Sequence, residues 1–206
     1  MSLTFLADLA KRRSIYKLGR ETNYGKSDMI LAIHDAMKFT PAPFDMPTTN
    51  VITAFGSHHE AIWQAVKEAF AAKTKGKSNQ KDTLEALDRR INGFTSGIGT
   101  ILFYEDQSLV DDLKETYAMY ADDFASWSLQ ACGMVQLNVW QALANLNLGA
   151  CLQHYNPLID AAMQQMFDVQ KDWKLIAQMP FGSIAEYPQP RDYNEPLGQD
   201  RLKVFK

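Results

Sequence analysis

Residues 124–159 contain no Asp, Glu, Lys or Arg, and this uncharged stretch constrains the fold more than any other part of the chain. Its pattern predicts one long helix that breaks at Leu148-Gly149, followed by a turn before Pro157. One side of the predicted helix is apolar, and the opposite side carries uncharged amides. The apolar side holds Cys132, Val135, Val139, Leu143 and Leu146, and the amides are Gln130, Asn138, Gln141 and Asn145.

A surface helix normally carries Lys and Glu on its outer side. Uncharged amides in their place indicate a helix that is covered on most sides. It is either a central core helix of a large domain or a helix whose amides meet another subunit. We do not expect it to cross a membrane, because its six amides would each be costly to bury unpaired in lipid.

Small and hydrogen-bonding residues follow the end of this helix. Gly149 and Ala150 come first, and Gln153-His154-Tyr155-Asn156 follow two residues later. These residue types are typical of a binding site, but they do not identify a ligand.

The composition sets the broad class of the protein. A chain of 206 residues, nearly half of them apolar, is long enough for one domain with a real core, which we expect to span residues 1–206. The formal charge of −3 is too small to indicate a nucleic-acid partner. Both cysteines lie in the apolar stretch and are expected to be buried and reduced. The first residues lack a secretory signal, so we expect a cytoplasmic protein.

A basic segment, Lys11-Arg12-Arg13-Ser14, follows the first predicted helix. The three cations suit the C-terminal end of a helix and could simply be solvated there. The alternative is anion recognition, because Arg pairs with phosphate oxygens in a bidentate manner and Ser14 adds a hydroxyl donor. The residues alone leave both interpretations open.

Several helices and a few strands scattered along the chain predict an α+β fold. We expect Ser2 to cap the first helix and Ser27 the second. His58 and His59 are expected at the surface, since no other metal ligands are close in sequence. The predicted helices are residues 2–11, 27–39, 60–72, 83–91, 106–120 and 158–167, in addition to the central one. The predicted strands are residues 50–55, 100–104, 173–179 and 201–205, with a turn at 180–182 and an extended arm at 187–198.

Five segments resemble the nitroreductase family of flavoproteins, in the branch of the yeast fatty-acid-repression nitroreductases and their bacterial counterparts. They lie in the same order as in that family and span nearly the whole chain. The GTILFYED and LQHYNP stretches are quite specific to this branch. The segments are Arg12-Arg13-Ser14-Ile15-Tyr16, residues 97–106, residues 140–160, residues 179–182 and residues 196–205.

The resemblance implies a homodimer, a mixed sheet surrounded by helices with a long central helix and a C-terminal extended arm, and FMN bound where the subunits meet. It places the basic segment at the FMN phosphate and ring edge, and the turn after the central helix beside the flavin ring. A cation near the C-terminus would also bind the phosphate. Arg201 is the first choice, and Arg191 and Lys203 are the alternatives. The residues so implicated are Arg12, Arg13, Ser14, Tyr16, Gly149, Ala150, Gln153, His154, Tyr155 and Arg201.

One loop departs from the family pattern. Where the family usually has a sequence like Pro-Ser-Ser-Phe-Asn-Ser-Gln, this chain has Pro41-Ala42-Pro43-Phe44-Asp45-Met46-Pro47. Several donors that would contact the flavin from the second subunit are lost. A carboxylate at Asp45 would also meet an electron-rich reduced flavin unfavourably. We therefore expect flavin affinity, redox potential or acceptor choice to differ.

The function implied is an oxidoreductase with a two-step flavin cycle. NADH or NADPH would reduce FMN, and a nitroaromatic, quinone or related small acceptor would then take the electrons. No catalytic acid or base and no metal site is assigned, and no Ser-His-Asp or P-loop pattern competes. Two alternatives remain open: a flavin-binding sensor with little turnover, and a cofactor-free dimeric scaffold.

Overall fold

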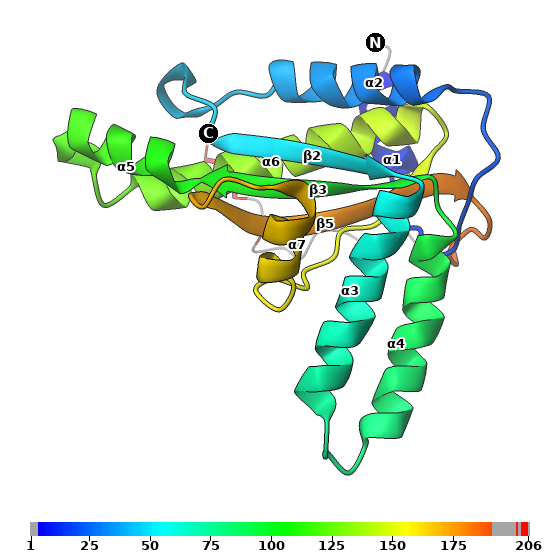
Figure 1. Ribbon diagram of the computed structural model, residues 1–206. Helices are drawn as coiled ribbons and strands as arrows, with labels where there is room; N and C mark the ends of the chain where they lie inside the picture. The colour runs from blue at the N-terminus through cyan, green and yellow to red at the C-terminus, as the bar shows by residue number, and fades with distance from the viewer. Residues whose placement is uncertain (1–3, 191–200, 202, 206) are drawn as a thin grey trace.

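The computed structural model describes residues 4–190, 201 and 203–205. These residues form a five-stranded sheet in the order β1–β5–β3–β2, with β4 paired to β5 (Figure 1). Every ladder is antiparallel, whereas the isolated bridge between Ser14 and Ala150 is parallel. The strands are β1 (Leu18–Gly19), β2 (Thr49–Phe55), β3 (Gly99–Asp106), β4 (Gly149–Ala150) and β5 (Trp173–Ile184).

Helices cover both faces of this sheet, which confirms the predicted α+β class. The helices α2 and α6 lie along one face, while α7 and the projecting α3–α4 hairpin lie on the other (Figure 1). The helices are α1 (Thr4–Lys11), α2 (Lys26–Lys38), α3 (Ser57–Thr74), α4 (Gln80–Thr95), α5 (Gln107–Thr116), α6 (Phe124–Asn145) and α7 (Asp160–Phe167). Two short 3-10 helices, η1 (Pro43–Asp45) and η2 (Ala118–Tyr120), lie between them.

Two hydrophobic cores sandwich the sheet because β3 is buried on both of its faces. Successive side chains of a strand point to opposite faces. Ile101 and Phe103 therefore pack under α2 and α6, whereas Leu102 and Tyr104 pack under α3, α4 and α7.

The central helix α6 follows the sequence prediction closely. It ends at Asn145, just before the predicted break, and the apolar side from Cys132 to Leu143 is buried. Its amides are only partly covered: Gln141 donates to the carbonyl of Asp8 in α1 (2.7 Å), and Asn138 donates to Thr40 (2.7 Å). Large apolar side chains of α6 remain exposed, namely Leu129, Met134 and Leu137.

Three local predictions are wrong. The helix α2 is capped at Gly25, whose N–H donates to Asp28 (2.8 Å), and not at Ser27, which lies inside the helix. The strand β5 continues through the expected turn at 180–182, because Gly97 and Gly182 allow the backbones to approach closely. Residues 201 and 203–205 form no strand and are exposed. Most of the expected arm, residues 191–198, lies outside the described part of the chain.

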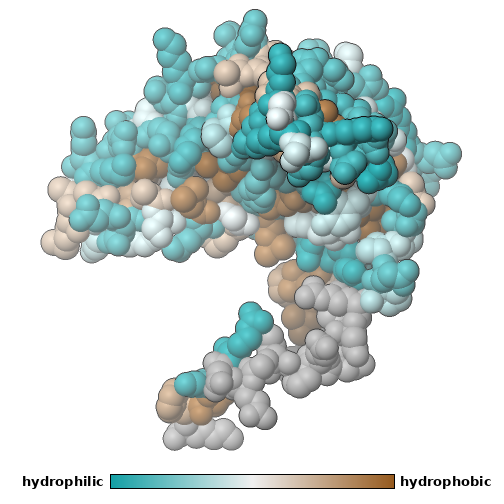
Figure 2. Space-filling model, turned by 90° about the horizontal axis from the view of Figure 1, so that it is seen from below, coloured by the Kyte–Doolittle hydropathy of each residue, from teal (hydrophilic) through white to brown (hydrophobic). Residues whose placement is uncertain are grey.

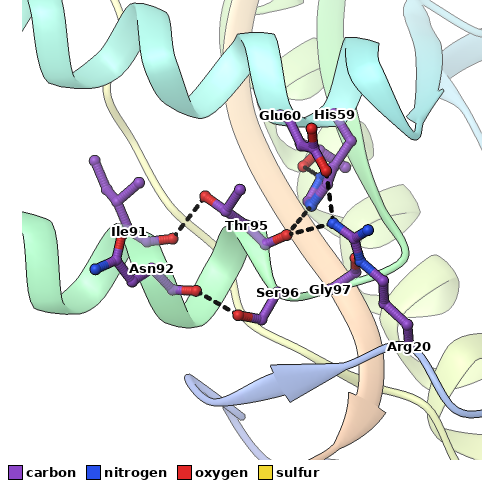
Figure 3. A network of polar contacts seen from close by, with 9 residues as sticks. Arg20, His59, Glu60, Ile91, Asn92, Thr95, Ser96 and Gly97 are labelled. Carbon is purple, nitrogen blue, oxygen red and sulfur yellow. Dashed lines mark hydrogen bonds and ion pairs between the residues drawn. The ribbon is translucent and has the colours of Figure 1, made fainter.

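The surface position predicted for His59 is also wrong, since this residue is fully buried in α3. Its Nε2 donates to the carbonyl of Thr95 at the end of α4 (3.3 Å), and its Nδ1 lies 2.7 Å from the hydroxyl of Thr100. Arg20 binds the same end of α4 through the carbonyls of Thr95 and Gly97 and pairs with Glu60 (2.7 Å), as Figure 3 shows. This network joins α3, α4 and β3, and it suits the negative end of the α4 dipole.

Candidate cofactor and acceptor site

The basic segment that follows α1 lines a cavity of about 410 Å³. It is lined by Arg12, Arg13, Ser14 and Tyr16 of this segment, together with Pro188 and Pro190. The guanidinium of Arg12 lies 4.3 Å from the centre of the Trp140 ring, which holds it by a cation–π contact. Arg13 donates to the carbonyl of Gln189 (3.1 Å). Four of the residues implicated by the sequence therefore share one cationic concavity.

The structure brings the small residues after α6 to the same place. The amide of Ile15 donates to the carbonyl of Ala150 (2.9 Å), and Ser14 forms the parallel bridge with Ala150. Gly149 is packed against Ile15 so closely that a Cβ at Gly149 would lie 2.8 Å from the Ile15 side chain. Residues more than a hundred positions apart in sequence thus pack directly against each other, and Ile15, Gly149 and Ala150 are buried there.

The 153–155 segment divides between the core and the surface. Gln153 is buried, and its backbone exchanges two hydrogen bonds with Gln178 of β5 (2.7 and 2.9 Å). The side chain of Gln178 in turn accepts from the amide of Tyr155 (2.7 Å). The Tyr155 ring packs edge-on against Trp63, whereas His154 is exposed. Only His154 of this segment is therefore free to turn towards solvent.

Two residues beside the site were missed by the sequence analysis. One is Trp140, which holds Arg12. The other is Arg90 of α4, which interacts with the hydroxyl of Tyr155: burial raises the pKa of Tyr155, and Arg90 offsets part of that rise. Gly93, one turn further along α4, packs against the carbonyl of Tyr16. In the sequence, the spacing of Arg90 and Gly93 indicates only that the two residues share one face of a helix. It points to the site only when the position of α4 in the fold is known.

The remaining residue implicated by the sequence is Arg201. It is exposed, and Lys203 is exposed as well, while Arg191 lies outside the described residues. The contribution of a C-terminal cation to the site therefore stays a prediction.

A second cavity, of about 330 Å³, lies behind the loop that departs from the family pattern. It opens between the end of α2, residues 40–50 and α6, where Ala131 and Val135 form the floor. Phe44 and Asp45 both have left-handed backbone angles, with φ of 53° and 57°. Such angles are unusual for residues other than glycine. The shape of this loop is therefore held by its surroundings.

The described residues do not favour thiol or metal chemistry. Burial raises the pKa of the Cys132 thiol, and it raises that of Cys151 to about 12, so neither is a ready nucleophile. No group of three metal-ligating side chains occurs among residues 4–190 and the described C-terminal positions. In the same part of the chain, no helix is both long and apolar enough to cross a membrane.

The fold is an α+β sandwich in which a cationic cavity lies near a close turn after the central helix, and a cavity of this kind suits an anionic group. A model of the nitroreductase family matches residues 9–183. The chain belongs to the nitroreductase family, which confirms the resemblance seen in the sequence.

Individual relatives agree with this assignment. Nitroreductase CinD from Lactococcus lactis, solved in complex with 4-nitrophenol, is 37% identical, with a TM-score of 0.86 over 98% of this chain and 100% of that one. The nitroreductase FRM2 of Saccharomyces cerevisiae is 29% identical over 191 residues, or 92% of each chain. A nitroreductase with bound FMN from Desulfitobacterium hafniense is 15% identical with a TM-score of 0.71, and this likeness shows the fold.

Proposed function

We propose that the protein is an FMN-dependent oxidoreductase that uses NADH or NADPH to reduce nitroaromatics, quinones or related small acceptors. The observation that carries the proposal is the hydrogen bond from Ile15 to Ala150, because it joins the cationic segment to the turn after α6. Family membership and the 4-nitrophenol complex of CinD support the reaction class. A cytoplasmic location, where reduced nicotinamide is available, is part of the proposal.

The residues present fit FMN. A phosphate group requires cationic and hydroxyl donors, and Arg12, Arg13 and Ser14 supply them within one cavity. Its dianionic charge would suit the two guanidinium groups. The exposed His154 would border the ring, and the buried turn at Gly149-Ala150 would lie behind it together with Arg90 and Tyr155.

We propose a homodimer with one site at each end of the interface. Exposed apolar side chains lie on α1, α2 and α6, whereas the face that carries α3 and α4 is largely hydrophilic (Figure 2). An apolar surface of this kind is typical of an interface. The cavity behind residues 41–47 would form the second half of the neighbouring site. The exposed residues are Phe5, Leu6, Ile30, Leu31, Leu129, Met134 and Leu137.

The mechanism assigns binding and electrostatic roles to the chain. When bound, FMN supplies the hydride and electron chemistry. Arg12 and Arg13 would hold its phosphate, and Trp140 fixes the position of Arg12. Arg90 would place a positive charge near the ring and so favour the reduced, anionic state. No side chain is assigned as an acid or base, so protons would come from water.

The test is a visible spectrum of the purified protein with added FMN, recorded before and after anaerobic NADH or NADPH. Flavin bands that bleach and return with 4-nitrophenol or a quinone are expected. Bands that persist with either nucleotide would indicate a flavin sensor instead. A protein that rejects FMN would overturn the proposal and leave a dimeric scaffold.

A further inference from the structure

Four aromatic side chains cluster around η2 and the start of α6. Tyr117 precedes η2, Tyr120 ends it, and Phe124 and Trp127 lie in the first turn of α6. Neighbouring rings contact one another, with centroids 5.3 Å apart for Phe124 and Trp127 and 5.7 Å apart for Tyr120 and Trp127. We call these four residues the aromatic box.

The ring of Phe44 occupies the box. Its centroid is 4.4 Å from that of Tyr117 in a stacked arrangement, and 5.6 to 6.4 Å from those of the other three rings. Phe124, the floor of the box, is only 1% exposed, whereas Phe44 itself remains 45% exposed. Phe44 therefore covers the box from the solvent side and is not itself part of a core.

The loop that carries Phe44 is fixed at its two ends. Thr40 accepts from Asn138 (2.7 Å), and Thr48 bonds to Ser128 (2.7 Å), both on α6. Between these anchors, the bonds made by the loop backbone run within the loop itself, from Asp45 to Ala42 and from Met46 to Pro43. The ring contacts of Phe44 thus connect the middle of the loop to the rest of the molecule.

The backbone of this loop is strained where Phe44 enters the box. Phe44 and Asp45 are consecutive residues with left-handed φ, and neither is glycine. Ring stacking in the box opposes that strain, so a competing ring would release the loop at little cost. The same loop forms the wall of the 330 Å³ cavity, because Pro41, Ala42 and Pro47 line it. Release of Phe44 would therefore open the box and that cavity together.

We propose that the aromatic box is a binding subsite for flat, electron-poor aromatic molecules, and that Phe44 is a built-in occupant which such a molecule displaces. The negative faces of Tyr and Trp rings favour a ring from which a nitro group withdraws electrons. This choice of ligand rests on the proposed function, since nitroaromatics are the acceptors proposed there. The loop from Thr40 to Thr48 acts as the gate of the subsite.

The test measures the dissociation constant of 4-nitrophenol by calorimetry, without NADH or NADPH, on the protein with and without added FMN. Phe44→Ala removes the competing ring, so the dissociation constant should fall about tenfold, or about 1.4 kcal/mol. Phe39→Ala is the matched control, because Phe39 is exposed at the end of α2 and outside the box; it should change nothing. Trp127→Ala in the Phe44→Ala background should abolish the gain.

Two results would overturn the inference: an unchanged or higher dissociation constant in Phe44→Ala, or a gain that survives Trp127→Ala. Phe44→Leu keeps an apolar anchor on the loop and gives a second, smaller decrease if the alanine variant folds poorly. The assay contains no reductant, so its result is separate from the proposed function. Turnover without tighter binding would overturn the subsite alone, and tighter binding without turnover would overturn the oxidoreductase proposal alone.

Discussion

The imidazole of His59 lies 2.7 Å from the hydroxyl of Thr100 in the buried contact between α3 and β3. The carbonyl of Thr95 can only accept, so Nε2 of His59 carries the proton and Nδ1 accepts from Thr100. The Thr100 oxygen in turn accepts from Nε1 of Trp63 (2.9 Å). A neutral His59 satisfies every partner in this chain of hydrogen bonds, and a protonated one does not.

Stability should therefore depend on pH through His59. Burial lowers the pKa of His59 below 6.5, so the unfolded state binds the proton first as the pH falls. The contribution of neutral His59 to the free energy of unfolding is complete above about pH 6.5. It is lost as the pH drops towards the pKa of His59 in the folded protein. In urea unfolding, the free energy of unfolding of the parent protein should be lower at pH 5.5 than at pH 7.5. His59→Phe should largely remove this difference. His34→Phe, at an exposed position, should keep the loss; an equal loss in both variants would contradict the assignment.

Thr100→Val should destabilise the fold by about 1–3 kcal/mol, because Trp63 and His59 would each lose a buried partner while the shape is kept. Thermal or urea unfolding measures the change. Thr22→Val is the comparison, since Thr22 is exposed and should alter stability by less than about 0.5 kcal/mol. Equal effects at the two positions would argue against the network.

Arg13→Gln should weaken FMN binding by about 10- to 150-fold, the range of one lost charge-assisted hydrogen bond of about 1.5–3 kcal/mol. Riboflavin, which lacks the phosphate, should bind equally well to the variant and the parent protein. Fluorescence titration with both flavins makes the comparison. Lys17→Gln is a control, because this exposed cation pairs with Glu186 instead. An equal loss of riboflavin affinity would show that Arg13 does not act through the phosphate.

Gly149→Ala should lower both FMN affinity and thermal stability, because the added methyl group would lie 2.8 Å from Ile15. We expect a stability loss of about 1–3 kcal/mol. Lys81→Ala, at an exposed position in the first turn of α4, is the control and should alter stability by less than about 0.5 kcal/mol. Thermal unfolding with and without FMN separates the two effects. A neutral result at Gly149 would mean that β4 is free to move.

Neither cysteine should react with a thiol reagent at pH 8 in the folded protein. Both thiols are buried, and burial raises the pKa of Cys151 to about 12. Two thiols per chain should appear on addition of denaturant. Rapid labelling of the native protein would show that α6 or β4 opens readily.

Much of the candidate site can be predicted from residues that resemble a family pattern. The basic segment and the Gly149-Ala150 turn are both implicated by their residue types and their order in the chain. The helix α6 is also predictable, because a long uncharged pattern of period 3.6 has few alternatives. The errors arise where a distant partner decides the outcome: His59 is buried because Thr95 and Thr100 supply its hydrogen bonds, and β5 runs through Pro180 because it pairs with β3.

The sequence by itself determined the α+β class, the central helix and the family, because periodicity and local motifs reflect interactions between residues near one another in the chain. Only the tertiary structure decided which distant residues meet. It placed Ile15 against Ala150, Arg90 beside Tyr155, and Phe44 among four aromatic rings. The physical reason is that these contacts depend on the pairing of strands and the packing of helices across the sheet. No local sequence pattern specifies which distant residues will come into contact.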